Sequence, residues 1–208
     1  MRASHQYKVC SQLPIKSRPF SAVTNKSFRR EYMKIADLPP FENKDVLWLQ
    51  TSGWYADIRI LLDGGGFSSF GGCVTWQRPY LTFHHDLDLG SGFSEDVGRI
   101  SLTSYGCIEN GVFVKDDKET PFEEKWLCQA SAVGSRVLLK KSRNRITGLE
   151  VQLGNHCIII LEGTAGRFFR YGSSWKASYR GEGFPITRRP TEEKTPSGWR
   201  VVEKVLPV

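Results

Sequence analysis

Residues 48–60 read Trp48-Leu49-Gln50-Thr51-Ser52-Gly53-Trp54-Tyr55-Ala56-Asp57-Ile58-Arg59-Ile60, and this stretch decides the fold. From Trp54 onward, apolar and polar side chains alternate. Side chains two positions apart on a β-strand share a face. One face of this strand therefore carries Trp54, Ala56, Ile58 and Ile60, and the other carries Tyr55, Asp57 and Arg59. Such an alternation predicts a strand that covers a core with its apolar face.

The rest of the chain consists of short β-like runs separated by turn residues. It holds 20 Gly and 10 Pro, and no stretch shows helical periodicity over about eleven residues. Asn110-Gly111 and Gly154-Asn155 are typical of hairpin turns. In the expected strand 80–89, the side chains that share a face are Phe83, His85, Leu87 and Leu89. We expect strands over 28–35, 46–50, 54–62, 70–78, 80–89, 99–104, 105–109, 122–130, 136–141, 149–153, 156–162, 167–171, 175–179 and 199–206.

So many short strands predict an all-β fold, either an antiparallel barrel or a sandwich. We favour a barrel of about ten strands, because closure removes sheet edges and few strands here carry the charges that protect an edge. The expected organisation is one β-barrel domain over 28–208. Within it, residues 181–198 hold three Pro and three Gly and are expected to form a loop insertion.

Residues 1–27 are expected to form a basic flexible extension. They are rich in Ser, Arg and Lys and poor in acid, which is also typical of a mitochondrial presequence. Pro14 and Pro19 interrupt any long amphipathic helix there, so we expect a cytoplasmic protein and keep a mitochondrial location as the alternative. No apolar run exceeds the five residues Cys157–Leu161, far short of the roughly 20 that a membrane helix needs, so we expect no transmembrane segment.

The net charge is +7, from 29 Lys and Arg against 22 Asp and Glu. Basic residues gather in 1–34 and again in 136–145. A basic surface can attract RNA, anionic lipid or acidic partners. We expect these segments to be solvated and do not expect a nucleic-acid partner, but a basic RNA- or membrane-surface-associated module stays open as an alternative. The five Cys include no Cys-x-x-Cys pair, which predicts scattered thiols rather than a disulfide scaffold or a zinc site.

Several short motifs taken together are similar to a known family. They are Phe28-Arg29-Arg30-Glu31-Tyr32, Trp48-Leu49-Gln50-Thr51, Asp57-Ile58-Arg59-Ile60, Phe70-x-Gly72, Trp76-x-Arg78, Asp96-x-Gly98-Arg99, Glu109-x-Gly111, Glu124-x-Trp126, Gly154-Asn155-His156, Trp199-Arg200-Val201 and Leu206-Pro207. Over about residues 28–208 the chain resembles an uncharacterised bacterial family that is itself similar to fungal proteins named for interacting with a casein kinase I. The resemblance implies a lipocalin-like, calycin-type barrel and no reaction. The basic extension and the 181–198 loop depart from the pattern.

The charged residues of these motifs are candidates for a site inside the barrel. Asp57 and Arg59 share a strand face, and in the same way Arg78 lies with Trp76 and Glu124 with Trp126. If these faces converge, Trp walls would contact a small, partly apolar ligand while Arg59 or Arg78 anchors a carboxylate or phosphate. The alternative is an ion-pair network that plugs the barrel. The predicted ligand-binding residues are Trp48, Tyr55, Asp57, Arg59, Trp76, Arg78, Glu124 and Trp126.

Catalytic and metal-binding patterns are weak. His84, Asp86 and Asp88 fall on one face of a strand, but metal sites usually draw ligands from several elements. No nucleophile motif occurs, and the adjacent Glu123 and Glu124 point to opposite faces. We therefore predict no catalytic residue, metal or cofactor. The favoured function is non-enzymatic: ligand binding in the barrel, or a module that interacts with a protein partner. The alternative is an isomerase or hydrolase that uses Asp57, Glu124 and His84.

Overall fold

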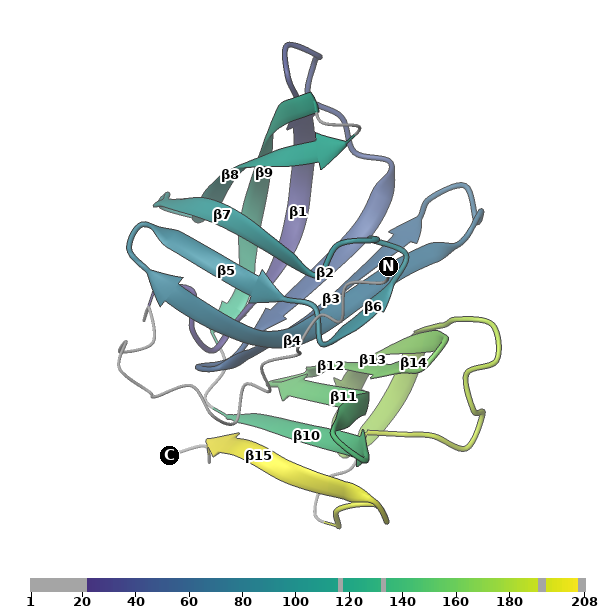
Figure 1. Cartoon of the computed structure of the whole chain (residues 1–208). Coiled ribbons are helices and arrows are strands. Elements are labelled where there is room, and N and C mark those ends of the chain that lie inside the picture. The colour runs from purple at the N-terminus through teal and green to yellow at the C-terminus, as the bar shows by residue number, and fades with distance from the viewer. Residues whose placement is uncertain (1–21, 116–117, 132–133, 191–193, 206–208) are drawn as a thin grey trace.

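The computed structural model describes residues 22–115, 118–131, 134–190 and 194–205. Their regular secondary structure is entirely β, with fifteen strands in two sheets (Figure 1). All pairings between neighbouring strands are antiparallel. The all-β antiparallel barrel predicted from the sequence is therefore confirmed.

Eight strands close into an up-and-down barrel. Each pairs with the next along the chain, the last returns to pair with the first, and β3 pairs with both β2 and β4. Closure leaves none of these strands as a free edge. The eight strands are β1 (Lys26–Ile35), β2 (Lys44–Gln50), β3 (Trp54–Leu61), β4 (Phe67–Gln77), β5 (Tyr80–His84), β7 (Glu95–Leu102), β8 (Gly106–Lys115) and β9 (Lys118–Ser131).

A bulge interrupts the expected strand 80–89. β6 (Leu87–Leu89) continues along the edge of β4 that β5 also uses, after a break at residues 85 and 86. Gly72 lies opposite the break, and a Cβ there would be 2.1 Å from the His84 carbonyl oxygen, so a larger residue does not fit. The extra residue reverses the alternation. The prediction that four side chains of this run share a face is therefore wrong: Phe83 points into the barrel and Leu87 points out of it.

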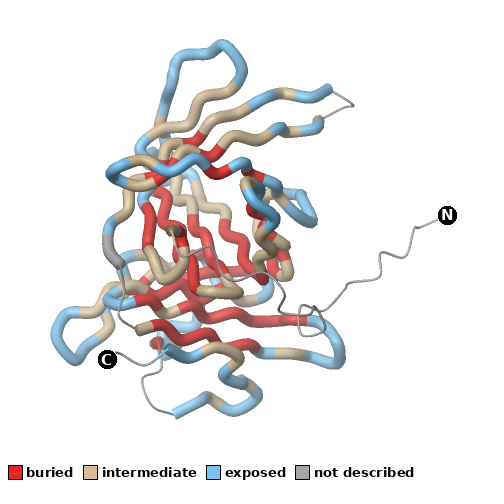
Figure 2. The backbone as a smooth tube through the Cα atoms, turned by 90° about the vertical axis from the view of Figure 1, so that its left-hand side faces the viewer, coloured by how far each residue is buried: buried red, intermediate tan, exposed pale blue. Residues whose placement is uncertain are grey.

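A second sheet of six strands packs against the outside of the barrel (Figure 1). Its strands contact β2, β3, β4 and β6, and buried residues run along both this sheet and the adjoining barrel wall (Figure 2). The barrel thus closes with eight strands rather than about ten, and the remaining strands form a separate layer. In spatial order they are β14 (Ser174–Arg180), β13 (Thr164–Tyr171), β12 (His156–Leu161), β11 (Arg145–Leu153), β10 (Ser135–Ser142) and β15 (Trp199–Val205).

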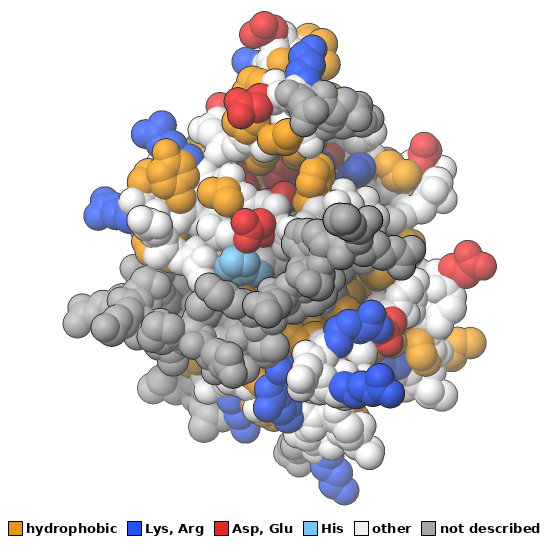
Figure 3. Space-filling view, in the orientation of Figure 1, with side chains coloured by type: hydrophobic (Ala, Val, Ile, Leu, Met, Phe, Trp, Pro, Cys, Tyr) orange, Lys and Arg blue, Asp and Glu red, His pale blue; other side chains and the backbone are white. Residues whose placement is uncertain are grey.

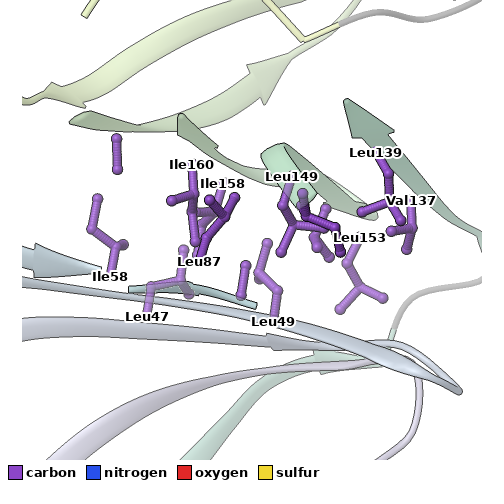
Figure 4. Packing of buried hydrophobic residues seen from close by; sticks show 14 residues of the cluster. Leu47, Leu49, Ile58, Leu87, Val137, Leu139, Leu149, Leu153, Ile158 and Ile160 are labelled. Atoms are coloured by element: carbon purple, nitrogen blue, oxygen red, sulfur yellow. The ribbon is translucent and has the colours of Figure 1, made fainter. Parts of the chain in front are cut away.

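The apolar core between barrel and sheet explains the alternation in residues 54–60. Leu47, Leu49 and Ile58 project from the barrel wall onto Leu149 and Ile158 of the second sheet (Figure 4). Ala56 belongs to the same cluster, and Trp54 and Ile60 pack against it. The apolar face of β3 is thus turned outward toward the sheet, while its polar and aromatic face lines the barrel interior.

The loop insertion covers the other face of the second sheet. Residues 181–190 and 194–198 contain no strand, as expected. Phe184 is buried against Phe168 of β13, with ring centroids 5.8 Å apart. Arg188 forms an ion pair with the fully buried Glu150 and lies over the Trp199 ring. Strands β10, β11 and β12 are therefore buried on both faces over most of their length.

Two predictions are wrong, one about a turn and one about a cysteine. Asn110-Gly111 is not a turn but lies inside β8. A Cβ on Gly111 would be 2.4 Å from the Phe122 ring, so glycine leaves room for this ring to lie over β8. Cys107, Cys128 and Cys157 are free thiols, as expected, but Cys73 is disulfide-bonded.

The predicted basic extension lies mostly outside the described residues, which begin at residue 22. Strand β1 starts at Lys26, two residues before the strand expected from the sequence. Within the described ranges, no helix is both long and apolar enough to cross a membrane.

The shared core predicts that barrel and sheet unfold together. Ile158 is fully buried between them, so Ile158→Ala should lower the free energy of unfolding by about 2–5 kcal/mol. Denaturant titration followed by Trp fluorescence, to which Trp residues of both the barrel and the second sheet contribute, and by far-UV circular dichroism should give coincident transitions. Ile186→Ala is the control, because Ile186 is 77% exposed and should change stability by less than about 0.5 kcal/mol. Two separated transitions would contradict a single cooperative core.

Candidate functional site

The barrel interior has an aromatic half. Trp48 of β2 is at its centre and stacks on Phe28 at 4.5 Å between ring centroids. Trp126 and Phe83 approach Trp48 edge-on, at 5.2 and 5.4 Å. The Trp48 indole N–H donates to Gln50 Oε1 at 3.2 Å, so its polar atom is satisfied. These rings are buried and fill their half of the lumen with the chain's own side chains.

The other half of the lumen holds a layer of charged side chains, and Arg30 anchors one side of it. Arg30 Nε and Nη2 donate to the two carboxylate oxygens of Glu42, at 2.7 and 3.1 Å. Its Nη1 donates to Glu124 Oε1 at 2.5 Å. Arg30 and Glu124 are both buried, so each neutralises a charge that would otherwise be costly to remove from water.

Arg59 anchors the opposite side of the layer. Its Nε donates to Asp57 Oδ1 at 3.0 Å, and its Nη1 donates to Glu124 Oε1 at 3.5 Å. The guanidinium also lies 4.8 Å from the centre of the Phe70 ring. Burial lowers the pKa of Arg59, but Asp57 and Glu124 outweigh burial and raise it above its ordinary value. Arg59 therefore keeps its charge, while burial raises the pKa of Asp57 despite this partner.

Glu109 of β8 differs from the other acids because no Arg or Lys among the described residues pairs with it. It faces Glu124 directly in the β8–β9 register. Its Oε2 accepts a hydrogen bond from the Trp126 indole at 3.0 Å, and its Oε1 has no partner in the described part of the chain. Burial and the Glu124 charge raise the pKa of Glu109 to about 8. Glu109 is therefore mostly protonated at neutral pH.

Tyr55 and His85 form part of the wall beside this layer. The Tyr55 hydroxyl is buried and has no hydrogen-bond partner within the described ranges. Burial, followed by the charges of Asp96 and Asp57, raises the pKa of Tyr55 well above its ordinary value, so the hydroxyl keeps its proton. The His85 ring stacks on Phe70 at 4.5 Å, and its Nε2 lies 3.2 Å from Asp96 Oδ2.

The charged layer is the accessible end of the lumen. The side chains of Arg59 and Glu42 are 18% and 17% exposed, whereas Trp48 and Trp126 are almost completely buried. Figure 3 shows a hollow in the barrel face, with hydrophobic side chains around its rim and acidic side chains inside it. A ligand would therefore meet the charged layer before the aromatic half.

The structure brings together most of the residues predicted from the sequence. Trp48, Tyr55 and Trp126 belong to the aromatic half, and the half-buried Trp76 packs against it. The remaining interior residues, all in the charged layer, are Asp57, Arg59 and Glu124. Whether these residues bind a ligand stays a prediction.

Arg78 does not join them. β4 ends at Gln77, and Arg78 is exposed in the turn that leads to β5. The prediction that Arg78 aims its charge at the interior is wrong, because the alternation of a strand does not extend past the end of that strand.

Four interior residues were not predicted: Arg30, Glu42, Glu109 and His85. Arg30 alternates with Phe28, and Glu109 alternates with Cys107, so a period-two search over these strands could have found both. His85 is turned inward by the bulge, which the sequence does not reveal. Glu42 lies between β1 and β2 and follows no periodicity.

The His84, Asp86 and Asp88 group serves separate structural contacts. His84 lies 3.3 Å from Glu95, Asp86 accepts the Cys73 backbone N–H at 3.1 Å, and Asp88 accepts backbone N–H groups of residues 91 and 92. His84 is not part of the charged layer. The set Asp57, Glu124 and His84, expected for an enzyme of the barrel class, is thus not assembled.

A second hollow of about 1330 Å³ lies between β6 and the basic β10–β11 hairpin. Its lining carries both signs of charge, including Asp86, Asp88, Lys141 and Arg143. Within the hairpin, Arg136 is buried and donates to Thr195, and Arg145 pairs with Glu162. This mixture is unlike the single-sign surface that follows a nucleic-acid backbone. The expectation that nucleic acid is not a partner stays a prediction.

No protein-family model matches the chain, and no curated protein matches it in sequence. The fold is similar to the crystal structure of the uncharacterised protein YLR301w from Saccharomyces cerevisiae, with a TM-score of 0.69. The two chains are 16% identical, and the match covers 86% of this chain and 98% of the yeast chain. At this identity the likeness shows a shared fold alone. It confirms the structural similarity to an uncharacterised fungal protein.

The ion network predicts unequal roles for two arginines. Arg59→Ala leaves Asp57 buried without its partner and should lower the free energy of unfolding by about 3 kcal/mol. Arg78→Ala should change it by less than about 0.5 kcal/mol, because Arg78 is exposed. Denaturant melts at pH 7 measure both. Equal losses from the two variants would contradict the interior position of Arg59.

The raised pKa of Glu109 predicts a pH dependence of stability. Between about pH 4.5 and 8 the folded carboxyl holds its proton while the unfolded one has lost it. The folded state then binds more protons, so its stability falls as pH rises through this window, by a few kcal/mol in order of magnitude.

Glu109→Gln removes this titration and keeps an acceptor for Trp126. Its free energy of unfolding, measured at intervals from pH 5 to 9, should improve steadily relative to wild type as pH rises. A constant difference between the two proteins across that range would show that Glu109 has an ordinary pKa.

Proposed function

We propose that this chain is a non-enzymatic binding protein that takes a small, partly apolar ligand at the mouth of a calycin-type barrel. Eight-stranded up-and-down barrels are of a size that holds one small ligand or fills with side chains. Here the aromatic half is filled, so the ligand binds above it, against the charged layer. We also propose that the chain belongs with the uncharacterised bacterial family that its motifs resemble, which is itself similar to the fungal casein-kinase-I-interacting proteins.

One observation carries this proposal. Two polar groups in the barrel interior have no hydrogen-bond partner within the described ranges: the Tyr55 hydroxyl, which is buried, and Glu109 Oε1. Buried polar groups in folded proteins are nearly always satisfied, and each one left unsatisfied costs about 1–3 kcal/mol. A ligand with polar atoms and an apolar body would satisfy these groups and contact the hydrophobic rim.

The same geometry supports binding rather than catalysis. Asp57 and Glu124 are both held by arginines, and His84 is not part of the charged layer. A general base must reach the proton that it removes, within about 3 Å. The two carboxylates are instead arranged to hold the layer together.

The test uses three probes with one phenyl body and different end groups: 2-phenylethylamine, 2-phenylethanol and 3-phenylpropanoate. We expect at least one of them to bind in the millimolar range and to move the Trp126 indole N–H resonance in nitrogen–proton correlation spectra. That N–H donates to Glu109 and so reports on the charged layer. No shift with any probe, up to tens of millimolar, would refute binding at the mouth.

A variant that removes one polar atom locates the site. Tyr55→Phe deletes a hydroxyl that bonds to none of the described residues, so the melting temperature should not fall. Binding of the probe that binds best should weaken about threefold to tenfold. Tyr171→Phe is the matched control, because Tyr171 is 59% exposed on the second sheet. Equal binding by both variants would place the site elsewhere.

A further inference from the structure

The charged layer holds more carboxylates than cations. Counting its members and the two groups at its edge, Asp96 and Lys44, gives five acids and three bases. Burial, and after it the charges of Arg59 and Arg30, lowers the pKa of Lys44, which weakens the cationic side further. The acids are Glu42, Asp57, Asp96, Glu109 and Glu124, and the bases are Arg30, Lys44 and Arg59.

Arg30 and Arg59 both pair with carboxylates of the layer. Arg30 bonds to Glu42 and Glu124, and Arg59 bonds to Asp57 and Glu124. A ligand carboxylate or phosphate would have to displace one of these acids inside the barrel, which leaves a buried charge unpaired. The two arginines are therefore poor anchors for an anion, contrary to the expectation from the sequence.

Glu109 is the acid that lacks a positive partner. The charged and titratable groups facing it come from four strands: Glu124 on β9, Asp57 and Arg59 on β3, Asp96 on β7, and Arg30 on β1. The charge of Arg59 lowers the pKa of Glu109, but the hydrogen bonds of Arg59 go to Asp57 and Glu124. Glu109 Oε1 thus makes no hydrogen bond with the described part of the chain.

Tyr55 supplies a second, independent sign of a missing partner. Tyr55 is 1% exposed, and its hydroxyl is unpaired within the described residues and close enough to Asp57, Asp96 and Arg59 for their charges to act on it. A hydroxyl can accept from an ammonium N–H while it donates elsewhere. An ammonium has three N–H donors and one positive charge. It can therefore pair with the Glu109 carboxylate, which lacks a cation, and donate to the Tyr55 hydroxyl, which lacks a hydrogen-bond partner.

We infer that the barrel mouth binds a ligand with a primary ammonium group, held by the Glu109 carboxylate and the Tyr55 hydroxyl, with its apolar body on the hydrophobic rim. This inference rests on the proposed function and specifies its ligand class. The ammonium brings the positive charge that the layer lacks. Carboxylate and ammonium then form a hydrogen-bonded ion pair that is screened from bulk water.

Binding is coupled to loss of a proton. Free Glu109 holds its carboxyl proton at pH 7, since its pKa is about 8, whereas an alkylammonium stays charged to about pH 10, as lysine does. The carboxyl O–H bond breaks on binding and its proton passes to the buffer. Affinity for the amine should therefore rise from pH 6 to 8 and level off above it.

The experiment compares the three phenyl probes on the full chain at pH 7, by titration of the Trp126 indole resonance. We expect 2-phenylethylamine to bind at least tenfold tighter than 2-phenylethanol and 3-phenylpropanoate. Calorimetry in two buffers of different ionisation enthalpy should show release of nearly one proton per amine bound.

Two variants complete the test. Glu109→Gln keeps an acceptor for Trp126 but cannot ionise, so it should lose the tenfold preference and the proton release while still binding 2-phenylethanol as wild type does. Glu123→Gln, on the neighbouring strand β9 and bonded to the Tyr32 hydroxyl instead, should behave as wild type. Circular dichroism confirms that each variant is folded.

The possible failures separate the two proposals. If the alcohol or the carboxylate binds as tightly as the amine, or if Glu109→Gln keeps the preference for the amine, the ammonium inference is overturned and binding at the mouth survives. If none of the probes binds, the proposed function fails and this inference fails with it.

Discussion

β3 is buried on both faces, and the rest of the structure depends on this constraint. Its apolar side chains, such as Ala56 and Ile58, pack against the second sheet, while Tyr55 and Asp57 line the barrel interior. A strand with two buried faces needs a partner layer on each side. The barrel supplies one layer by closing on itself, and the six-stranded sheet supplies the other.

The charges inside the barrel follow from the same constraint. Asp57 and Arg59 lie on the inward face of β3, so closure buries them together with Arg30 and Glu124. Removal of these charges from water is offset because they pair with one another. Glu109 has no such cation and instead holds its proton. The layer is therefore held in position by its own ion pairs, and it contains one acid, Glu109, that pairs with no Arg or Lys of the described residues.

The inward face of β3 could be predicted from particular residues. Alternation placed Asp57 and Arg59 together with Tyr55, and it placed Glu124 with Trp126. It failed for Arg78, which lies past the end of its strand, and for Leu87, which a bulge turns outward. It also missed Glu109, although this residue alternates with the buried Cys107, because adjacent Asn-Gly residues resemble a turn.

The sequence by itself determined the β-class, the antiparallel pairing of short strands and which side chains of β3 share a face, because these follow from local backbone geometry with a period of two. Only the tertiary structure decided which face is inside, how many strands close the barrel, and that Arg30 and Glu109 meet Arg59. Those features depend on residues far apart in the chain. Closure of the barrel and packing of the second sheet bring these residues together. A local sequence pattern does not show which distant residues will meet.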